Sequence, residues 1–132
     1  MPISYAIDAA RGIVRIEMTG AIGPADAVMF LERLAIEPAL RPAMPQLVDF
    51  RRVQAPPTAA ESESVANAFA RLKWRFEGAR CAIVVADPLM YGAIRQFAAL
   101  AARACVEVRP FLDADAAERW LGVSDPSSGL TM

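Results

Sequence analysis

The sequence lacks several kinds of residue that catalytic sites commonly use. It contains no histidine, the commonest general base near neutral pH, and its only lysine is Lys73. It also contains no glycine-rich phosphate loop, no nucleophile elbow and no cluster of metal-ligating side chains. Carboxylates and arginines can still catalyse reactions, but an enzyme is the least favoured function class. We expect no catalytic residues, no metal and no cofactor.

The charge and hydropathy of the chain argue against two further kinds of partner. Its net charge is -1, whereas nucleic-acid-binding domains usually carry a clear basic excess. No apolar run approaches the roughly 18 residues needed to span a bilayer, and the first residues show no signal-peptide pattern. We therefore expect a cytoplasmic bacterial protein that neither binds nucleic acid nor spans a membrane.

Cysteine is scarce as well, because Cys81 and Cys105 are the only two. Both are expected to be thiols in the cytoplasm. A redox pair is conceivable if their strands are parallel neighbours. However, no C-x-x-C motif, histidine or helix N-terminus lies beside either residue to lower its pKa. The sequence therefore predicts two buried structural cysteines.

Strand patterns and amphipathic helices alternate along the chain. Its 132 residues fit one domain, and 55% are hydrophobic, which is enough for a sizeable core. Apolar residues alternate within 3–7 and within 14–18, which predicts two strands joined as a hairpin at Gly12. Three more strands are predicted, at Leu47–Phe50, Cys81–Ala86 and Val106–Arg109.

Four helices are predicted, and each follows a strand. They begin at Gly23-Pro24, Thr58, Asp87-Pro88 and Asp113. The second is the longest and runs over Thr58–Phe76. The order predicts an α/β fold over residues 1–122, a single domain whose mixed, mostly parallel sheet starts with an antiparallel hairpin. Residues 123–132 lack an apolar period and are expected to form a flexible tail.

Four segments carry a resemblance to a known family. They are the opening hairpin ending in Thr19-Gly20, Leu47-Val48-Asp49-Phe50-Arg51-Arg52-Val53, Ala82–Asp87 with Tyr91-Gly92 and Arg95-Gln96-Phe97, and Phe111-Leu112-Asp113 with Ala117 and Trp120-Leu121. Together they resemble the STAS superfamily, and within it the stage II sporulation protein AA-like (STAS/SEC14-like) group. The resemblance implies strands added in sequence order. It also implies a scaffold for regulatory protein contact or small-ligand binding, and rarely for catalysis.

Thr58 lies where the resemblance would place a regulatory phosphosite. Anti-sigma-factor antagonists carry an Asp-Ser-Ser-Gly-like motif at this helix start, whereas this chain has Pro57-Thr58-Ala59-Ala60. A phosphate at a helix N-terminus would be electrostatically favourable. The simpler interpretation is a capping box, in which Thr58 and Glu61 bond to each other's backbone N–H groups. We expect Thr58 to act as a cap.

Asp49, Arg51 and Arg52 are expected at or just beyond the carboxyl end of their strand. Ligands commonly enter open α/β sheets at this edge, where two arginines can hold a carboxylate or a phosphate. The alternative is a solvated loop in which the arginines pair with Asp49.

Asp87, Tyr91 and Arg95 are expected on the first turns of the third helix. Tyr91 and Arg95 lie one turn apart, so they share a face and, with Asp49, are candidates for one edge pocket. The alternative is structural, with Asp87 as the N-cap ahead of Pro88.

Trp74 is the candidate for an exposed aromatic residue at an interface. At about 100° per residue it points away from the helix stripe centred on Phe69, and Arg71 and Arg75 flank it. Trp and Arg are enriched where proteins bind each other. The alternative is that these basic residues only favour the helix dipole.

The sequence therefore favours a non-catalytic regulatory or protein-interaction module, with a protein partner or a second copy in a homodimer. The alternative is a module that binds a small apolar or amphipathic, lipid-like ligand. A large apolar pocket would favour the ligand, and a packed interior with an apolar surface patch would favour protein partners.

Overall fold

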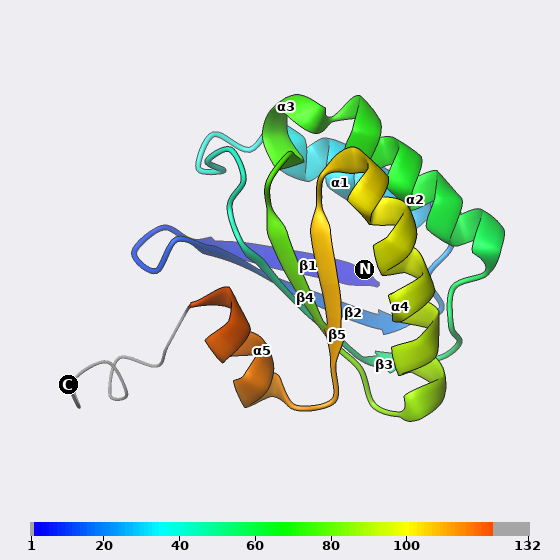
Figure 1. Ribbon diagram of the computed structural model, residues 1–132. Coiled ribbons are helices and arrows are strands. Elements are labelled where there is room, and N and C mark those ends of the chain that lie inside the picture. Colours follow the sequence, from blue (N-terminus) through cyan, green and yellow to red (C-terminus); the bar gives the residue numbers. More distant parts are fainter. Residues whose placement is uncertain (1, 123–132) are drawn as a thin grey trace.

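The strands of the sheet lie in the order in which they occur in the sequence. In the computed structural model, which describes residues 2–122, β1 pairs with β2 in antiparallel and β2 to β5 pair in parallel (Figure 1). The strands are β1 (Ile3–Asp8), β2 (Ile13–Gly20), β3 (Gln46–Val53), β4 (Arg80–Val84) and β5 (Glu107–Phe111). The helices are α1 (Pro24–Ala35), α2 (Ala59–Arg71), α3 (Lys73–Phe76), α4 (Pro88–Ala101) and α5 (Ala114–Leu121), with a 3₁₀ turn at Ala102–Ala104. The predicted α/β architecture is confirmed, and the predicted tail at 123–132 lies outside the described residues.

The opening hairpin turns where the sequence predicts. Gly12 has a φ of 68°, and its N–H donates to the carbonyl of Asp8 at 2.8 Å. A side chain at this φ would be strained, which explains the glycine. The turn sets the register from Ile3 opposite Met18 to Asp8 opposite Ile13. The alternating apolar residues of the two strands therefore share one face of the sheet, whereas Ile13 faces the other side.

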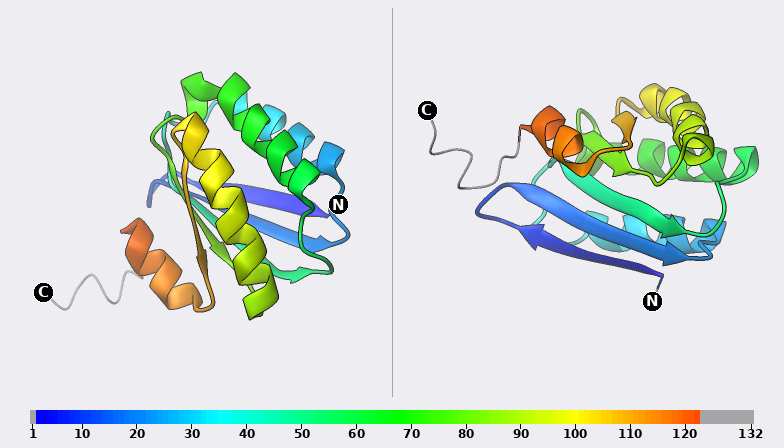
Figure 2. Two further views of the ribbon diagram at one scale, coloured as in Figure 1. Left: turned by 45° about the vertical axis from the view of Figure 1, so that its right-hand side comes forward. Right: turned by 90° about the horizontal axis from the view of Figure 1, so that it is seen from below.

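Helices α1, α2 and α4 cover that face and enclose the main core. Met90, Ile94, Phe97 and Ala101 of α4 are all buried, as their helical spacing predicts. Phe69 of α2 lies between two aromatic rings, with centroids 5.5 Å away in Phe76 and 6.3 Å away in Phe97. These three helices form one layer, in which α2 contacts both α1 and α4 (Figure 2).

Among residues 2–122, helix α5 is the one helix that packs on the opposite face of the sheet. Ala82 and Val84 of β4 pack against Ala117 and Leu121 of α5, while the alternate residues of β4 belong to the main core. Asp113 caps this helix and Gly122 ends it with a φ of 75°, as predicted. Because α5 contacts mainly β4, the described part of the chain leaves the other face of β1 and β2 largely uncovered (Figures 1 and 2).

The long helix predicted over Thr58–Phe76 is interrupted at Leu72. This residue has φ -103° and ψ 29°, so the chain leaves α2 there and continues as the single turn of α3. Arg75 fixes the new direction, because its Nη2 donates to the carbonyls of Glu37 and Leu40 at 3.0 and 2.7 Å. The hydrogen bonds of Arg75 with the loop after α1 thus accompany the end of the continuous helix at Leu72.

Strand β3 is longer than predicted and contains a β-bulge. Its partners on β2 step from Glu17–Asp49 to Thr19–Arg52, so β3 accommodates one extra residue. Asp49 therefore lies within the strand and not at its end, which corrects the prediction. The bulge leaves Arg51 and Arg52 both exposed and returns Val53 to the core.

Candidate functional site

A cavity of about 320 Å³ lies between the sheet and the helical layer. Strands β2 and β3 supply one wall, because their period of two directs alternate apolar residues to this side. The other lining residues come from β4, from helices α1, α2 and α4, and from the loops before α1 and α2. Apolar lining residues include Ile16, Leu31, Val48, Phe50, Phe69 and Phe97. Its volume is within the roughly 300–1,000 Å³ range of small-molecule sites and about twice the ~150 Å³ of an engineered cavity that binds benzene.

The cavity opens at the carboxyl ends of β2 and β3. Its exposed lining residues belong to the loop before α1 and the loop before α2, at 21–24 and 54–58. Pro24, Pro56 and Pro57 stiffen both loops by fixing φ. This is the edge at which open α/β sheets usually admit ligands.

Two polar residues lie among the apolar ones. Gln46 and Ser62 are the buried polar residues within 2–122, and both line the cavity. Gln46 is 2% exposed, and its side-chain Nε2 has no hydrogen-bond partner. Buried polar groups are normally paired, so an unpaired amide at a cavity wall is unusual.

Thr58 borders the cavity and forms the predicted capping box. Its Oγ1 accepts from the N–H of Glu61 at 3.1 Å, and Glu61 Oε1 accepts from the N–H of Thr58 at 2.8 Å. The hydroxyl and the carboxylate are thus both occupied with the first turn of α2. Thr58 is the one member of the predicted ligand edge that lines this cavity.

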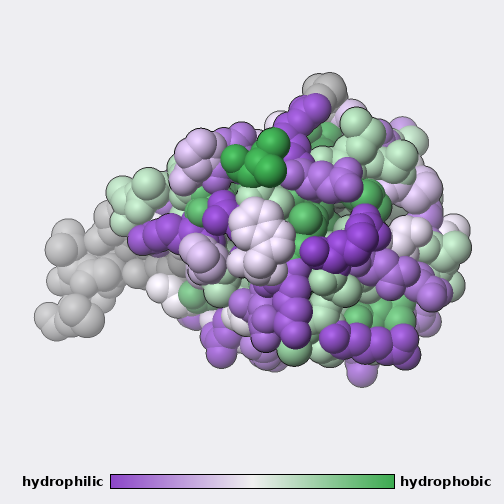
Figure 3. All heavy atoms as spheres, turned by 90° about the horizontal axis from the view of Figure 1, so that it is seen from above, coloured by the Kyte–Doolittle hydropathy of each residue, from purple (hydrophilic) through white to green (hydrophobic). Residues whose placement is uncertain are grey.

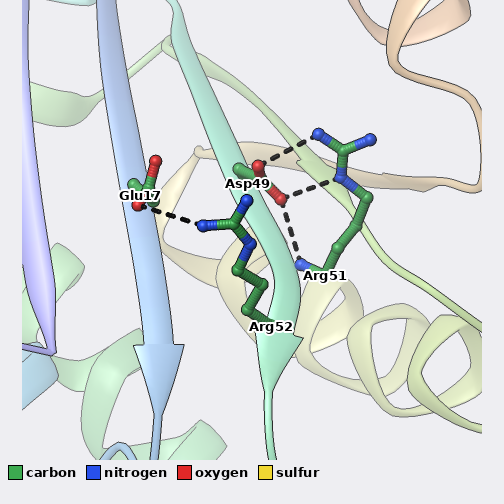
Figure 4. A network of polar contacts seen from close by, with 4 residues as sticks. All are labelled: Glu17, Asp49, Arg51 and Arg52. Carbon is green, nitrogen blue, oxygen red and sulfur yellow. Dashed lines mark hydrogen bonds and ion pairs between the residues drawn. The ribbon is translucent and has the colours of Figure 1, made fainter.

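Asp49, Arg51 and Arg52 lie on the opposite face of the sheet. Arg51 binds Asp49 through Nε and Nη2, each at 3.0 Å, and through its backbone N–H at 3.1 Å (Figure 4). These bonds from Arg51 hold the pKa of Asp49 below its ordinary value, and Asp49 raises that of Arg51. Arg52 lies 4.0 Å from Glu17. Both arginines are thus paired with carboxylates. The alternative interpretation predicted such pairing with Asp49 in a loop, but the residues lie in strand β3 and Arg52 pairs with Glu17.

A hollow of about 440 Å³ lies on this open face, between the sheet and α5. Asp49 and Arg51 line it, together with Arg15, whose Nη1 is 3.3 Å from Glu118 Oε1. Each arginine on this wall already has a carboxylate partner. The hollow therefore offers an incoming anion little unpaired positive charge.

Asp87, Tyr91 and Arg95 do not join Asp49 in either cavity. Asp87 caps α4, its carboxylate accepting from the N–H of Met90 at 2.9 Å. Tyr91 is half-buried against the core, and Arg95 is exposed. The predicted edge residues are thus divided among the cavity mouth, the open face and α4.

Trp74 is 63% exposed, as its angle from Phe69 predicts, although the helix is interrupted before it. The guanidinium of Arg75 lies 5.2 Å from the Trp74 ring centre. Arg71 is exposed, but Arg75 is half-buried and holds the loop after α1, so it is not free to contact a partner. Figure 3 shows mainly hydrophilic residues on the α3 side of the molecule, with small, separate hydrophobic areas.

The two cysteines differ, which corrects the prediction that both are buried. Cys81 lines the cavity from β4, and burial raises the pKa of its thiol to about 12. Cys105 is exposed, in the left-handed turn that leads to β5. Glycine or asparagine usually occupies a left-handed position of this kind. The sequence around Cys105 therefore gives no sign that the chain turns there and exposes the cysteine.

No helix within residues 2–122 is long and apolar enough to cross a membrane. In the same stretch, no three potential ligand side chains among Cys, Asp and Glu come together to hold a metal ion.

A comparison with solved structures identifies the fold. An uncharacterized protein of the DUF3478 family from Shewanella loihica PV-4, itself with a SpoIIAA-like fold, is similar at a TM-score of 0.61. The two chains are 18% identical, and the match covers 90% of this chain and 93% of the other. The chain has a SpoIIAA-like fold. Comparisons with protein-family models and with curated proteins find no match. The STAS-like architecture implied by the sequence is thus confirmed as a fold.

The two buried polar residues that line the cavity, Gln46 and Ser62, were not among the predicted site residues. Gln46 is the first residue of β3 and shares a face with Val48 and Phe50, so its position in the pattern could have predicted its burial. Ser62 lies three residues before Val65 and seven before Phe69, on the inner face of α2. The cavity itself leaves no periodic signal.

Proposed function

We propose that this chain is a non-catalytic STAS-like module that binds one small apolar or amphipathic ligand in the cavity under α1 and α2. Of the two interpretations of the sequence, this was the alternative. The apolar cavity of about 320 Å³ supports it, because it opens through the loops where α/β folds bind ligands. We place the protein in the bacterial cytoplasm, where such a ligand would be drawn from water by burial of its apolar surface.

Binding of a neutral apolar fluorophore tests the proposal. N-phenyl-1-naphthylamine should bind the parent protein saturably and at one site, with increased emission in the apolar environment. Ala27→Phe should abolish the signal, because Ala27 lines the cavity and a phenyl ring there would occupy it.

Ala25→Phe is the matched control. Ala25 lies on the same helix, is exposed and does not line the cavity, so this variant should bind the probe like the parent. Circular dichroism should show that all three proteins are folded. Equal binding by both variants would place the probe outside the cavity, and no binding by the folded parent would contradict the proposal.

A second candidate function, contact with a protein partner or a second copy, rests on Trp74. Its ring is 63% exposed and held by Arg75, and an ordered exposed tryptophan is a common interface anchor. If copies associate here, sedimentation should show a parent dimer that Trp74→Ala converts to monomer. An unchanged dimer would place the interface elsewhere, and a monomeric parent would leave only a different protein as partner.

A further inference from the structure

Gln46 presents a hydrogen-bond donor that no group within residues 2–122 uses. The residue is 2% exposed and lines the apolar cavity, and its Nε2 lacks a partner. Leaving a buried donor unpaired costs free energy, whereas an apolar side chain of similar shape would not. The stability of the empty protein therefore gives no reason for an amide at this position.

The surroundings of Gln46 supply no partner within the sheet. Its neighbours on the adjacent strands are Val14 and Cys81. Val14 has no polar side-chain atom, and burial keeps the Cys81 thiol protonated, with a pKa of about 12. Gln46 begins β3, while the mouth lies beyond its other end at Val53. Gln46 therefore lies at the inner end of the cavity, away from the mouth.

The charges around the cavity restrict the ligand further. No arginine or lysine of residues 2–122 lines it, and its one charged lining residue is Glu61, near the mouth. A buried carboxylate or phosphate would have no cation to pair with, which is costly in an apolar site. At the mouth, the same anion would face the carboxylate of Glu61.

We propose that the ligand is neutral and carries a hydrogen-bond acceptor at its buried end, such as a ketone, ester or amide carbonyl, and that Gln46 Nε2 donates to it. The inference rests on the proposed function and makes Gln46 its specificity-determining residue. An apolar ligand without an acceptor fits the walls but leaves the amide unpaired.

Three probes of one shape test this inference. They are 2-acetylnaphthalene, which is neutral with a carbonyl, 2-ethylnaphthalene, which lacks an acceptor, and 2-naphthoate, which is anionic. Titrations followed by amide chemical shifts should show that the parent binds the ketone about 3- to 10-fold more tightly than the ethyl compound. The naphthoate should bind most weakly.

Gln46→Leu removes the amide at nearly constant volume. It should abolish the preference for the ketone and keep the affinity for 2-ethylnaphthalene. Without ligand it should unfold at a higher urea concentration than the parent, because it removes an unpaired buried donor. Gln96→Leu, a matched change on the exposed side of α4, should alter neither property.

The outcomes separate the two proposals. If the folded parent binds none of the probes, the proposed function fails. If the parent binds the ketone and the ethyl compound equally, the cavity binds apolar ligands but Gln46 does not select among them, and this inference fails. A parent that prefers naphthoate, or a Gln46→Leu variant that keeps the ketone preference or loses stability, would also overturn it.

Discussion

The two faces of β2 and β3 satisfy their polar groups in different ways. On the open face, Asp49 is paired with Arg51, and Glu17 and Arg15 have partners of opposite charge. On the covered face, the Gln46 amide donor has no partner and adjoins a cavity. Alternation along β3 thus produces a polar surface whose charged groups are paired and an apolar interior that contains an unpaired hydrogen-bond donor. The difference indicates that the covered face is where a ligand would gain most by binding.

The largest contrast between exposed and covered regions should appear in thiol reactivity. Cys105 is exposed, whereas Cys81 is buried beside the cavity with its thiol pKa raised to about 12. A disulfide reagent at pH 8 should modify Cys105 readily and Cys81 more slowly by roughly 10³-fold or more, because the raised pKa leaves little reactive thiolate at Cys81. Mass spectrometry of the labelled peptides measures both rates. Comparable rates would mean that the Cys81 thiol is not buried in the cavity wall as the structure has it.

The core of the covered face should be the most sensitive to truncation. Phe69→Ala should lower the free energy of unfolding by about 3–5 kcal/mol, since Phe69 is 3% exposed and contacts two aromatic rings. Phe111→Ala, on the α5 side, should cost less because Phe111 is half-buried, and Trp74→Ala should cost least. Urea denaturation compares the three. Equal losses for Phe69 and Trp74 would show that the helical layer is packed differently.

The capping box at the cavity mouth should contribute moderately to the free energy of unfolding. Thr58→Ala should lower the free energy of unfolding by about 0.5–2 kcal/mol, because it removes the acceptor for the Glu61 N–H. Thr58→Ser retains that acceptor and should lose much less. We also expect that phosphoproteomics of the source cells finds no substantial phosphate on Thr58. Stoichiometric phosphate there would restore the antagonist-like switch as the leading function.

Substitutions on the open face of the sheet should change the free energy of unfolding least. Asp49→Asn should lower the free energy of unfolding at pH 7 by no more than about 1 kcal/mol, since the pair with Arg51 is solvent-exposed and screened. The pKa of Asp49 is depressed in the folded state from its ordinary value of 3.8, chiefly by the Arg51 hydrogen bonds. The contribution of the Asp49 carboxylate to the free energy of unfolding is therefore fully present above pH 3.8. It is lost as the pH falls through the lower pKa of the folded state. Denaturation at pH 7 and pH 3 should show the difference from the parent shrinking.

The sequence predicts the fold well because its elements follow local rules. Periods of two and 3.6 locate β2 and α4, and the caps at Thr58 and Asp87 locate two helix starts. Two departures come from contacts distant in sequence. Arg75 redirects the chain after Leu72 by binding the loop after α1, and the bulge extends β3 beyond Asp49.

The candidate site was harder to predict for a different reason. The predicted residues are charged or aromatic groups near strand and helix ends, and most of them are paired or capped in the structure. The cavity arises where side chains from six elements fail to fill the interior, and no pattern within one segment encodes that space. The sequence signs that could have pointed to it are Gln46 and Ser62, polar residues in phase with the buried faces of their elements, and neither was predicted as a site residue.

Native mass spectrometry of the freshly purified protein tests the central claim most directly, because it reports a retained ligand together with the oligomeric state. Part of the parent protein should carry a single additional small neutral molecule per chain, released by mild activation. Ala27→Phe should be observed only as the bare chain. A parent that is bare throughout and matches this variant, or an added mass that persists in the variant, would contradict the account of the cavity as a ligand site.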